Sequence, residues 1–316
     1  MPTTKTDQPG SVEFWHNIFS RIQNQLNYDP DDKEAEFDPA TLSTLRLMRD
    51  PDLPVPLRAL NQLSPGAKKR LYRPLLPPEL LERFAIDPIT WRGPNGDGHV
   101  KLVAPPEKGL VKLEAYHRLE ARDPFAYLEL VDNNFNGINV VLFVINDPES
   151  PRFDTDVTST GERTLFGTVN RNLEAEEAAM AAGLAPGQVR TGLRASPLAV
   201  QHMEAFLQLM GHESFAAEPL TYVAAVLFER RGFSYMSGRR LMAEIDREFR
   251  AGGRLRAALD GNSPFRQPGQ ADSIRGRAWA IHDGILEVIG KSWNNVRMVK
   301  QLGRDAGINT FPDGPY

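Results

Sequence analysis

The residues best suited to chemistry lie in two stretches of the C-terminal half, of which residues 183–197 are the first. This stretch holds glycines and arginines directly ahead of a predicted helix, namely Gly183, Gly187, Arg190, Gly192 and Arg194. Glycines let a backbone approach a ligand closely, guanidinium groups complement an anion, and a helix start adds its own positive end. We therefore expect Arg190, Gly192 and Arg194 to contact an anionic ligand. A glycine-rich connection with surface arginines is the alternative.

The second stretch, residues 229–277, contains eleven arginines, six acidic residues and no lysine. Arg275 and Arg277 precede Trp279, and we expect the three to bind a carboxylate or a phosphate, because a guanidinium recognises either group through paired hydrogen bonds. The same arginines could instead tie helices together through acidic side chains. The candidates for such partners are Glu244, Glu248, Asp260 and Asp272. The sequence leaves both interpretations open.

Four further residues are weak candidates for catalysis, although the sequence indicates no reaction. His282 and Asp283 are adjacent, so on a helix their side chains point about 100° apart and do not form a pair by themselves. His117 and Glu129 lie near predicted strands and are candidates for a general base. The sequence therefore assigns no catalytic residue.

The common catalytic and metal-binding motifs are not present. Gly284 and the run Gly290–Ser292 are separated by five residues, whereas a phosphate-binding P-loop needs four. His212 and Glu213 begin like a zinc-protease motif, but Ala216 stands where the second histidine is required. No close pair exists among the six histidines, so no metal site is predicted.

The composition is that of an ordinary globular chain. Of 316 residues, 41% are hydrophobic and 25% are charged, and the net charge of -4 does not favour a nucleic-acid partner. The chain has no cysteine, which excludes disulfides, thiolate metal sites and cysteine nucleophiles. The longest apolar run, Ile138–Ile145, is far shorter than the about 20 residues that span a bilayer, and no secretory signal is visible. We expect a soluble, cytoplasmic protein without a membrane partner.

The middle of the chain carries the pattern of an antiparallel sheet. Alternating or continuous apolar residues predict strands at 98–104, 110–116, 125–131 and 138–145. Turn-forming residues 132–137 indicate a hairpin between the last two. Residues 152–157 and 164–169 are expected to extend the sheet. The glycine-dense residues 93–98 are predicted to form a plain turn.

Apolar periodicity and capping residues predict helices both before and after the sheet in the sequence. The expected ranges are 13–26, 39–49, 64–72, 77–84, 173–182, 196–210, 220–231, 238–250 and 273–289. The order predicts an α+β fold with a central antiparallel sheet at about 98–170 and a helical C-terminal half. Residues 1–95 are expected to be a tail and proline-rich helical arm packed on an α+β core, residues 96–316.

Residues 219–233 resemble the closing helix of the GNAT family of N-acetyltransferases, in which an apolar helix ends in a phrase similar to Leu227–Phe233. The resemblance implies acetyl-CoA as a cofactor, with its phosphates at Gly187–Arg194. The sequence departs from the family's pyrophosphate motif at Val189 and Arg194. The catalytic tyrosine usual in that family is also missing, since Phe228 occupies its position.

Two functional hypotheses follow. The first is a small-molecule enzyme, with an acyltransferase-like activity as one candidate, or a ligand-binding protein that uses an arginine-rich pocket for an anionic ligand. The second is a non-catalytic structural or assembly protein whose arginines form internal or intersubunit ion pairs. Self-association into a homo-oligomer stays open, as do the substrate and the reaction.

Overall fold

The computed structural model describes residues 53–165, 167 and 170–316. These residues group into two compact units. The first unit contains residues 53–148, 192–216 and 301–303, and the second contains the described residues of 149–191 together with 217–300 and 304–316. Helices and a largely antiparallel set of strands confirm the predicted α+β class. The domain boundary predicted near residue 95 stays a prediction.

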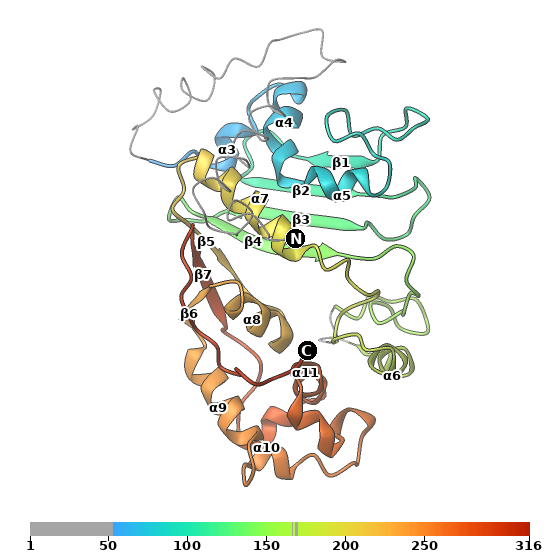
Figure 1. Cartoon of the computed structure of the whole chain (residues 1–316), viewed down its shortest axis with the longest axis vertical. Helices are drawn as coiled ribbons and strands as arrows, with labels where there is room; N and C mark the ends of the chain where they lie inside the picture. Colours follow the sequence, from blue (N-terminus) through green and yellow to red (C-terminus); the bar gives the residue numbers. More distant parts are fainter. Residues whose placement is uncertain (1–52, 166, 168–169) are drawn as a thin grey trace, which may run out of the picture. The chain divides into compact units, whose positions relative to one another are not determined.

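The first unit is built on a meander of four antiparallel strands (Figure 1). These are β1 (Val100–Val103), β2 (Leu110–Ala115), β3 (Ala126–Asp132) and β4 (Ile138–Ile145). β5 (Ser214–Ala217), most of which belongs to this unit, follows β4 in the strand order. The four strands lie where the apolar patterns predict them, and the hairpin between β3 and β4 is confirmed.

Side-chain alternation gives this sheet two different faces. Leu113 on β2 and its partner Leu128 on β3 are buried in the core, as are their neighbours Val111 and Leu130. The opposite face is polar. It carries Lys101, Lys112, Glu114, Tyr127 and Glu129. Because successive residues of a strand point to opposite faces, one register sets both the core and the polar surface.

Helices cover the apolar face of the sheet in the first unit. They are α3 (Leu57–Leu60), α4 (Pro65–Tyr72), a 3₁₀ helix (Arg73–Leu75), α5 (Pro78–Glu82) and α7 (Ser196–Leu209). Ser64 starts α4 by accepting a hydrogen bond from the N–H of Ala67, and Pro65 occupies the first helical position. α3 packs on β2 and β3, and α7 packs on the 3₁₀ helix.

The second unit is mainly helical, with one pair of short antiparallel strands (Figure 1). Its α-helices are α6 (Leu173–Ala181), α8 (Tyr222–Glu229), α9 (Arg239–Phe249), α10 (Arg254–Ala257) and α11 (Ile274–His282). Its 3₁₀ helices are Pro264–Arg266, Pro268–Asp272 and Ile285–Ile289, and its strands are β6 (Ser234–Ser237) and β7 (Arg297–Gln301). A small core of Ala179, Leu184, Phe265 and Trp279 joins α6 to α11.

Two local predictions are wrong. Residues 152–157 form no strand, and the described residues of 164–169 form a turn, so that the bridge between Val157 and Arg163 is the one β contact described there. Buried Thr164 holds this segment instead, since its hydroxyl donates to Thr155 O at 2.8 Å. The helix predicted at 273–289 is interrupted at Gly284, whose φ of 83° ends α11 in the left-handed region.

The predicted helices at 13–26 and 39–49 lie outside the described residues. The remaining predicted helices correspond to α4, α5, α6, α7, α8 and α9, within one or two residues at most ends. Strands β5, β6 and β7 were not predicted, because each is only four or five residues long. No helix in the described part of the chain combines the length and apolar character needed to cross a bilayer.

Asn61 connects the helices of the first unit to its sheet. Its side chain is fully buried, and its amide donates to Lys108 O at 2.7 Å and to Leu110 O at 2.8 Å. Its carbonyl oxygen accepts the Tyr72 hydroxyl at 2.6 Å. The residue therefore satisfies the buried Tyr72 hydroxyl and two partly buried carbonyl groups at once, and it holds the end of α4 against the start of β2.

We predict that Asn61→Ala lowers the free energy of unfolding by about 3 kcal/mol, because it leaves the buried Tyr72 hydroxyl and two partly buried carbonyl groups without their partner. Chemical denaturation followed by circular dichroism measures the loss. Gln62→Ala is the matched control, since Gln62 is exposed, and it should change stability by no more than about 0.5 kcal/mol. Equal effects of the two substitutions would contradict the role of Asn61.

Candidate functional site

An open pocket of about 440 Å³ lies in the first unit, and we call it the basic pocket. It is lined by Pro65, Lys68, Lys69, Thr90, Trp91, Arg92, Gly98, Val100, Leu102 and Ala104. α4 supplies the two lysines on successive helical positions. The loop before β1 supplies the aromatic residue and the arginine, and β1 itself supplies the floor.

The loop that carries Thr90 and Trp91 is shaped by Asp87. One carboxylate oxygen of Asp87 accepts the N–H of Thr90 at 2.6 Å, the Thr90 hydroxyl at 2.9 Å and the N–H of Ile89 at 3.0 Å. Burial works against the ionised form, but these hydrogen bonds and the charge of Arg73 outweigh it and lower the pKa of Asp87. An ionised Asp87 therefore fixes this wall of the pocket at neutral pH.

Trp91 has the least ordinary conformation in the pocket. Its φ is 61°, in the left-handed region that bulky residues rarely adopt, and hydrogen bonds hold it there from Trp91 N to Asp87 O and from His99 N to Trp91 O. Its side chain is only 3% exposed, and its indole N–H has no hydrogen-bond partner among the described residues. Strained backbone and unpaired buried donors both concentrate at functional sites.

The electrostatic character of the pocket is one-sided. Lys68, Lys69 and Arg92 are cationic, and none of the other residues that line the pocket is acidic. Lys68 Nζ donates to Ala104 O at 2.9 Å, and Arg92 Nη1 donates to Gly96 O at 2.7 Å. Lys69 Nζ lies 5.9 Å from the centre of the Trp91 ring. These contacts hold positive charge beside a concave surface, which is an arrangement suited to an anion.

The basic pocket was not predicted from the sequence. The predicted turn at 93–98 does form, with Gly96 at a φ of 82°, and an isolated bridge between Arg92 and Gly98 closes it. This turn brings Arg92 to the start of β1. The sequence did contain one signal, because two of the nine lysines are adjacent at Lys68 and Lys69. Arg92 is more than twenty residues further along the chain, so the sequence did not indicate that the three line one pocket.

The arginines singled out in the sequence lie mainly in the second unit, where they contact protein groups. Arg277 is 4% exposed, and its Nη1 donates to Asp246 Oδ1 at 2.9 Å while its Nε donates to Ala271 O at 2.7 Å. Its guanidinium also lies 3.4 Å from the centre of the Phe311 ring. This buried charge is therefore held by a carboxylate, a backbone carbonyl and an aromatic ring.

Arg275 and Trp279 point to other partners. Arg275 donates to Gly183 O and, at 3.3 Å, to Tyr316 O, and its guanidinium lies over the Tyr316 ring. Trp279 is 1% exposed, stacks on Phe265 with ring centres 5.2 Å apart, and donates its N–H to Leu184 O. The structure thus places Arg275, Arg277 and Trp279 on α11 but in three separate surroundings.

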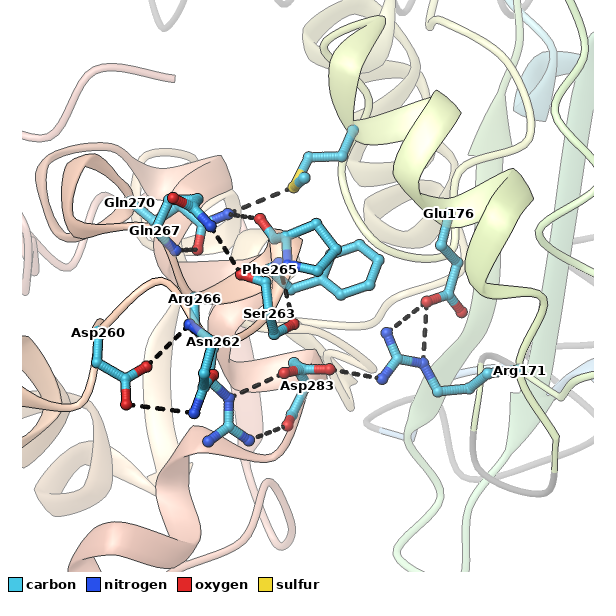
Figure 2. Close-up of polar contacts among 12 residues, drawn as sticks. Arg171, Glu176, Asp260, Asn262, Ser263, Phe265, Arg266, Gln267, Gln270 and Asp283 are labelled. Atoms are coloured by element: carbon cyan, nitrogen blue, oxygen red, sulfur yellow. Dashed lines mark hydrogen bonds and ion pairs between the residues drawn. The ribbon is translucent and has the colours of Figure 1, made fainter.

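A second set of ion pairs joins α6 to the end of α11 (Figure 2). Arg171 donates from Nε to Glu176 Oε2 at 2.9 Å and from Nη1 to Asp283 Oδ1 at 2.8 Å. Arg266 reaches the other oxygen of Asp283 through Nε, also at 2.8 Å. Two guanidinium groups and two carboxylates therefore alternate along one chain of hydrogen bonds.

His282 extends this chain. Its Nε2 lies 3.2 Å from Glu176 Oε1, and its ring meets that of Trp279 edge-on. Burial opposes the ionisation of Glu176, but the hydrogen bonds from His282 and Arg171 outweigh it and lower the pKa of this carboxyl. A Cβ at Gly167 would come within 2.5 Å of the imidazole, so only glycine lets the loop approach so closely. His282 and Asp283 are thus brought into one network through Glu176 and Arg171.

The glycine and arginine stretch at 183–197 is divided between the two units. Arg190 belongs to the second unit and donates to Ser150 O. Gly192 and Arg194 belong to the first unit, where a Cβ at Gly192 would lie 3.1 Å from Ile145 O. Arg194 is exposed with a φ of 58°, and α7 begins two residues after it.

The two candidate bases of the first unit lie on different parts of the sheet. His117 follows β2, and its ring centre is 6.2 Å from that of Phe84. Glu129 lies within β3 on the polar face and accepts the Tyr127 hydroxyl at 2.6 Å. Burial and this hydrogen bond raise the pKa of Tyr127, so the tyrosine stays a donor to the carboxylate.

Comparison with known proteins gives no relative. No protein-family model, no curated protein sequence and no solved structure matches the chain. Within the described residues, no group of three or more histidine, aspartate or glutamate side chains is placed to hold a metal ion.

We predict that Arg277→Ala destabilises the protein by about 3–5 kcal/mol, because it breaks a buried ion pair and leaves Asp246 with a weaker set of partners. Thermal and chemical unfolding measure the loss. Arg247→Ala is the control, since the Arg247 side chain is 64% exposed and its pairs with Glu244 and Glu248 are surface pairs worth about 0–1 kcal/mol. Similar losses from both substitutions would contradict this assignment.

We further predict that Glu176→Gln destabilises the protein by about 2 kcal/mol at pH 7 and by progressively less in acid. A carboxyl whose pKa is lowered on folding stabilises the fold above its unfolded pKa, and this stabilisation is lost as the pH falls through the lower, folded pKa. Urea unfolding at a series of acidic pH values tests whether the free energies of unfolding of the parent protein and Glu176→Gln approach each other as the pH falls. Glu177 lies on the exposed side of α6, so the free energy of unfolding of Glu177→Gln should change with pH as that of the parent protein does.

Proposed function

We propose that the protein binds an anionic ligand in the basic pocket of the first unit. The observation that carries the proposal is the lining of this pocket: three cationic side chains, no acidic one, and a buried indole N–H with no partner among the described residues. A pocket of this size accommodates a small molecule or a few side chains of a larger one. Attraction between the cationic side chains and the anion supplies the affinity, and the hydrogen-bonded loop at Trp91 fixes the shape of the pocket.

The arginine-rich residues 229–277 have a different role in this proposal. Arg277, Arg256 and Arg254 pair with Asp246, Asp272 and Glu248 respectively. These contacts favour the interpretation of internal ion pairs that tie the helices of the second unit together. The ligand site is accordingly placed on lysines and an arginine of the first unit rather than on the arginines of α11.

Acyl transfer with acetyl-CoA and a cytoplasmic location stay predictions from the sequence. Acetyl-CoA carries phosphates, so it belongs in a panel of anions to be tested against the basic pocket. Binding alone would support a ligand-binding protein. Turnover of the bound molecule would support an enzyme.

We predict that isothermal titration with inorganic phosphate, citrate, ADP and acetyl-CoA detects binding of at least one of them by the full chain. Lys69→Gln and Arg92→Gln should each weaken that binding about fivefold, since each removes one partly exposed charge worth about 1 kcal/mol. Raising the salt concentration should weaken it as well, because mobile ions screen such interactions.

Lys101→Gln is the matched control for this experiment. Lys101 is exposed on β1, but its side chain points to the polar face, away from Val100 and Leu102 in the pocket. Its replacement removes the same charge from the same strand and should leave affinity within about twofold. Absence of binding by every anion, or equal losses in all three variants, would rule out the proposed site.

A further inference from the structure

The basic pocket lies along the open edge of a sheet. β1 begins the strand order and pairs with β2 on one side, and no other described strand pairs with it. Val100 and Leu102, which line the pocket, are alternate residues of this strand. The pocket thus lies beside the edge strand and includes two of its residues together with cationic side chains.

Hydrogen bonds at the start of β1 show which of its backbone groups face outward. Tyr116 N donates to His99 O at 2.9 Å, so the His99 carbonyl faces β2 while its N–H donates to Trp91 O. Two residues later, Lys101 directs its backbone groups toward β2. Residues of an antiparallel pair alternate in this direction. The N–H and C=O groups of Val100 and Leu102 therefore point away from β2, and no described hydrogen bond reaches their N–H groups.

Positive charge marks both ends of this edge. Lys68 Nζ lies 2.9 Å from Ala104 O, just beyond the end of β1. Arg92 is bridged to Gly98, two residues before the strand begins. Because Trp91 O also accepts the His99 N–H, residues 91 and 92 close the edge before Val100, and the open part runs from Val100 to Ala104. An occupant of this part meets Arg92 near one end and Lys68 near the other.

We infer that the ligand of the basic pocket is an extended acidic peptide that adds to β1 as a further strand. The inference rests on the proposed function and names the class of its ligand. Outward-facing N–H and C=O groups at alternate residues are the donors and acceptors that a peptide backbone matches in register. A small anion offers acceptors alone and leaves the carbonyl groups of Val100 and Leu102 unmatched.

The side chains of such a peptide are distributed by the same alternation. Every second residue faces the pocket, where the middle position meets Val100 and Leu102 and the outer positions meet the cations. The geometry therefore calls for an apolar residue flanked on each side, two or more positions away, by glutamate or aspartate. Lys101 and Val103 point to the other face and leave the intervening peptide positions less restricted.

The test uses a heptapeptide, acetylated and amidated at its ends, with glutamate at its second and sixth positions, valine at its fourth and threonine or serine elsewhere. Fluorescence anisotropy of a labelled copy measures its affinity for the full chain. Two further peptides carry N-methyl groups on alternate amides, one on the odd and one on the even positions. These peptides have the same charge, and each loses the N–H groups of one backbone edge.

We expect the unmodified peptide to bind and only one of the two methylated peptides to lose affinity, by about tenfold or more, because a strand pairs with β1 through one edge. Val100→Pro should reproduce the loss, since proline is tolerated where an edge N–H faces outward but removes that donor. Lys101→Gln should leave affinity within about twofold. Circular dichroism checks that Val100→Pro is folded, and the methylated peptides test the pairing without altering the protein.

The outcomes separate this inference from the proposed function. Small anions that bind through Lys69 and Arg92 while the peptide does not would leave the proposed function standing and overturn the inference. Equal binding of both methylated peptides would also overturn it, because charge alone would then hold the ligand. Failure of every small anion would overturn the proposed function itself, and with it the inference that rests on it.

Two other occupants of the edge give distinct results. A second copy paired through β1 would produce a dimer in sedimentation that Val100→Pro abolishes, and it would overturn the inference. The chain also contains an acidic run at residues 29–38. Peptide binding that is seen only after Asp31, Asp32, Glu34 and Glu36 are changed to their amides would assign the edge to that run, and would likewise overturn the inference.

Discussion

Backbone groups of an extended strand must pair or face water, and this requirement organises the first unit. β2 directs alternate residues to β3 and to β1, so its register fixes both neighbours at once. The same alternation buries Leu113 and Leu128 on one face and leaves Lys112 and Glu129 on the other. β1 is the edge strand of this sheet, so the backbone groups on its outer side pair with no further described strand, and the basic pocket lies beside it.

The second unit is subject to a related constraint on charge. A buried ion is costly unless hydrogen bonds and opposite charge surround it. Arg277 meets this condition through Asp246, a backbone carbonyl and aromatic rings, and Glu176 meets it through Arg171 and His282. Arginine suits such positions better than lysine because its planar group makes several hydrogen bonds in fixed directions. The lysine-free composition of residues 229–277 is consistent with that requirement.

Much of the local structure could be predicted from the sequence, because apolar periodicity and caps such as Ser64 act within one element. The four longer strands and most helices follow from these signals. Strand β5 and the pair β6 and β7 depend on partners distant in the chain, and four or five residues carry too little pattern. The same reason hid the basic pocket: Lys68 and Arg92 line one pocket only once the turn at 93–98 and α4 are both in place.

The path of the chain has a consequence for the order in which the protein can mature. The first unit contains residues 53–148 and takes up the polypeptide again at 192–216. Within it, Val55 N bonds to Met210 O, and His202 bonds to Pro74 O across 128 positions. During synthesis, residues 149–191 emerge from the ribosome before α7 does, so these contacts of α7 can form only afterwards. Contacts between residues distant in sequence form more slowly than local contacts. The sheet of β1–β4 therefore keeps part of its apolar face exposed until α7 is in place.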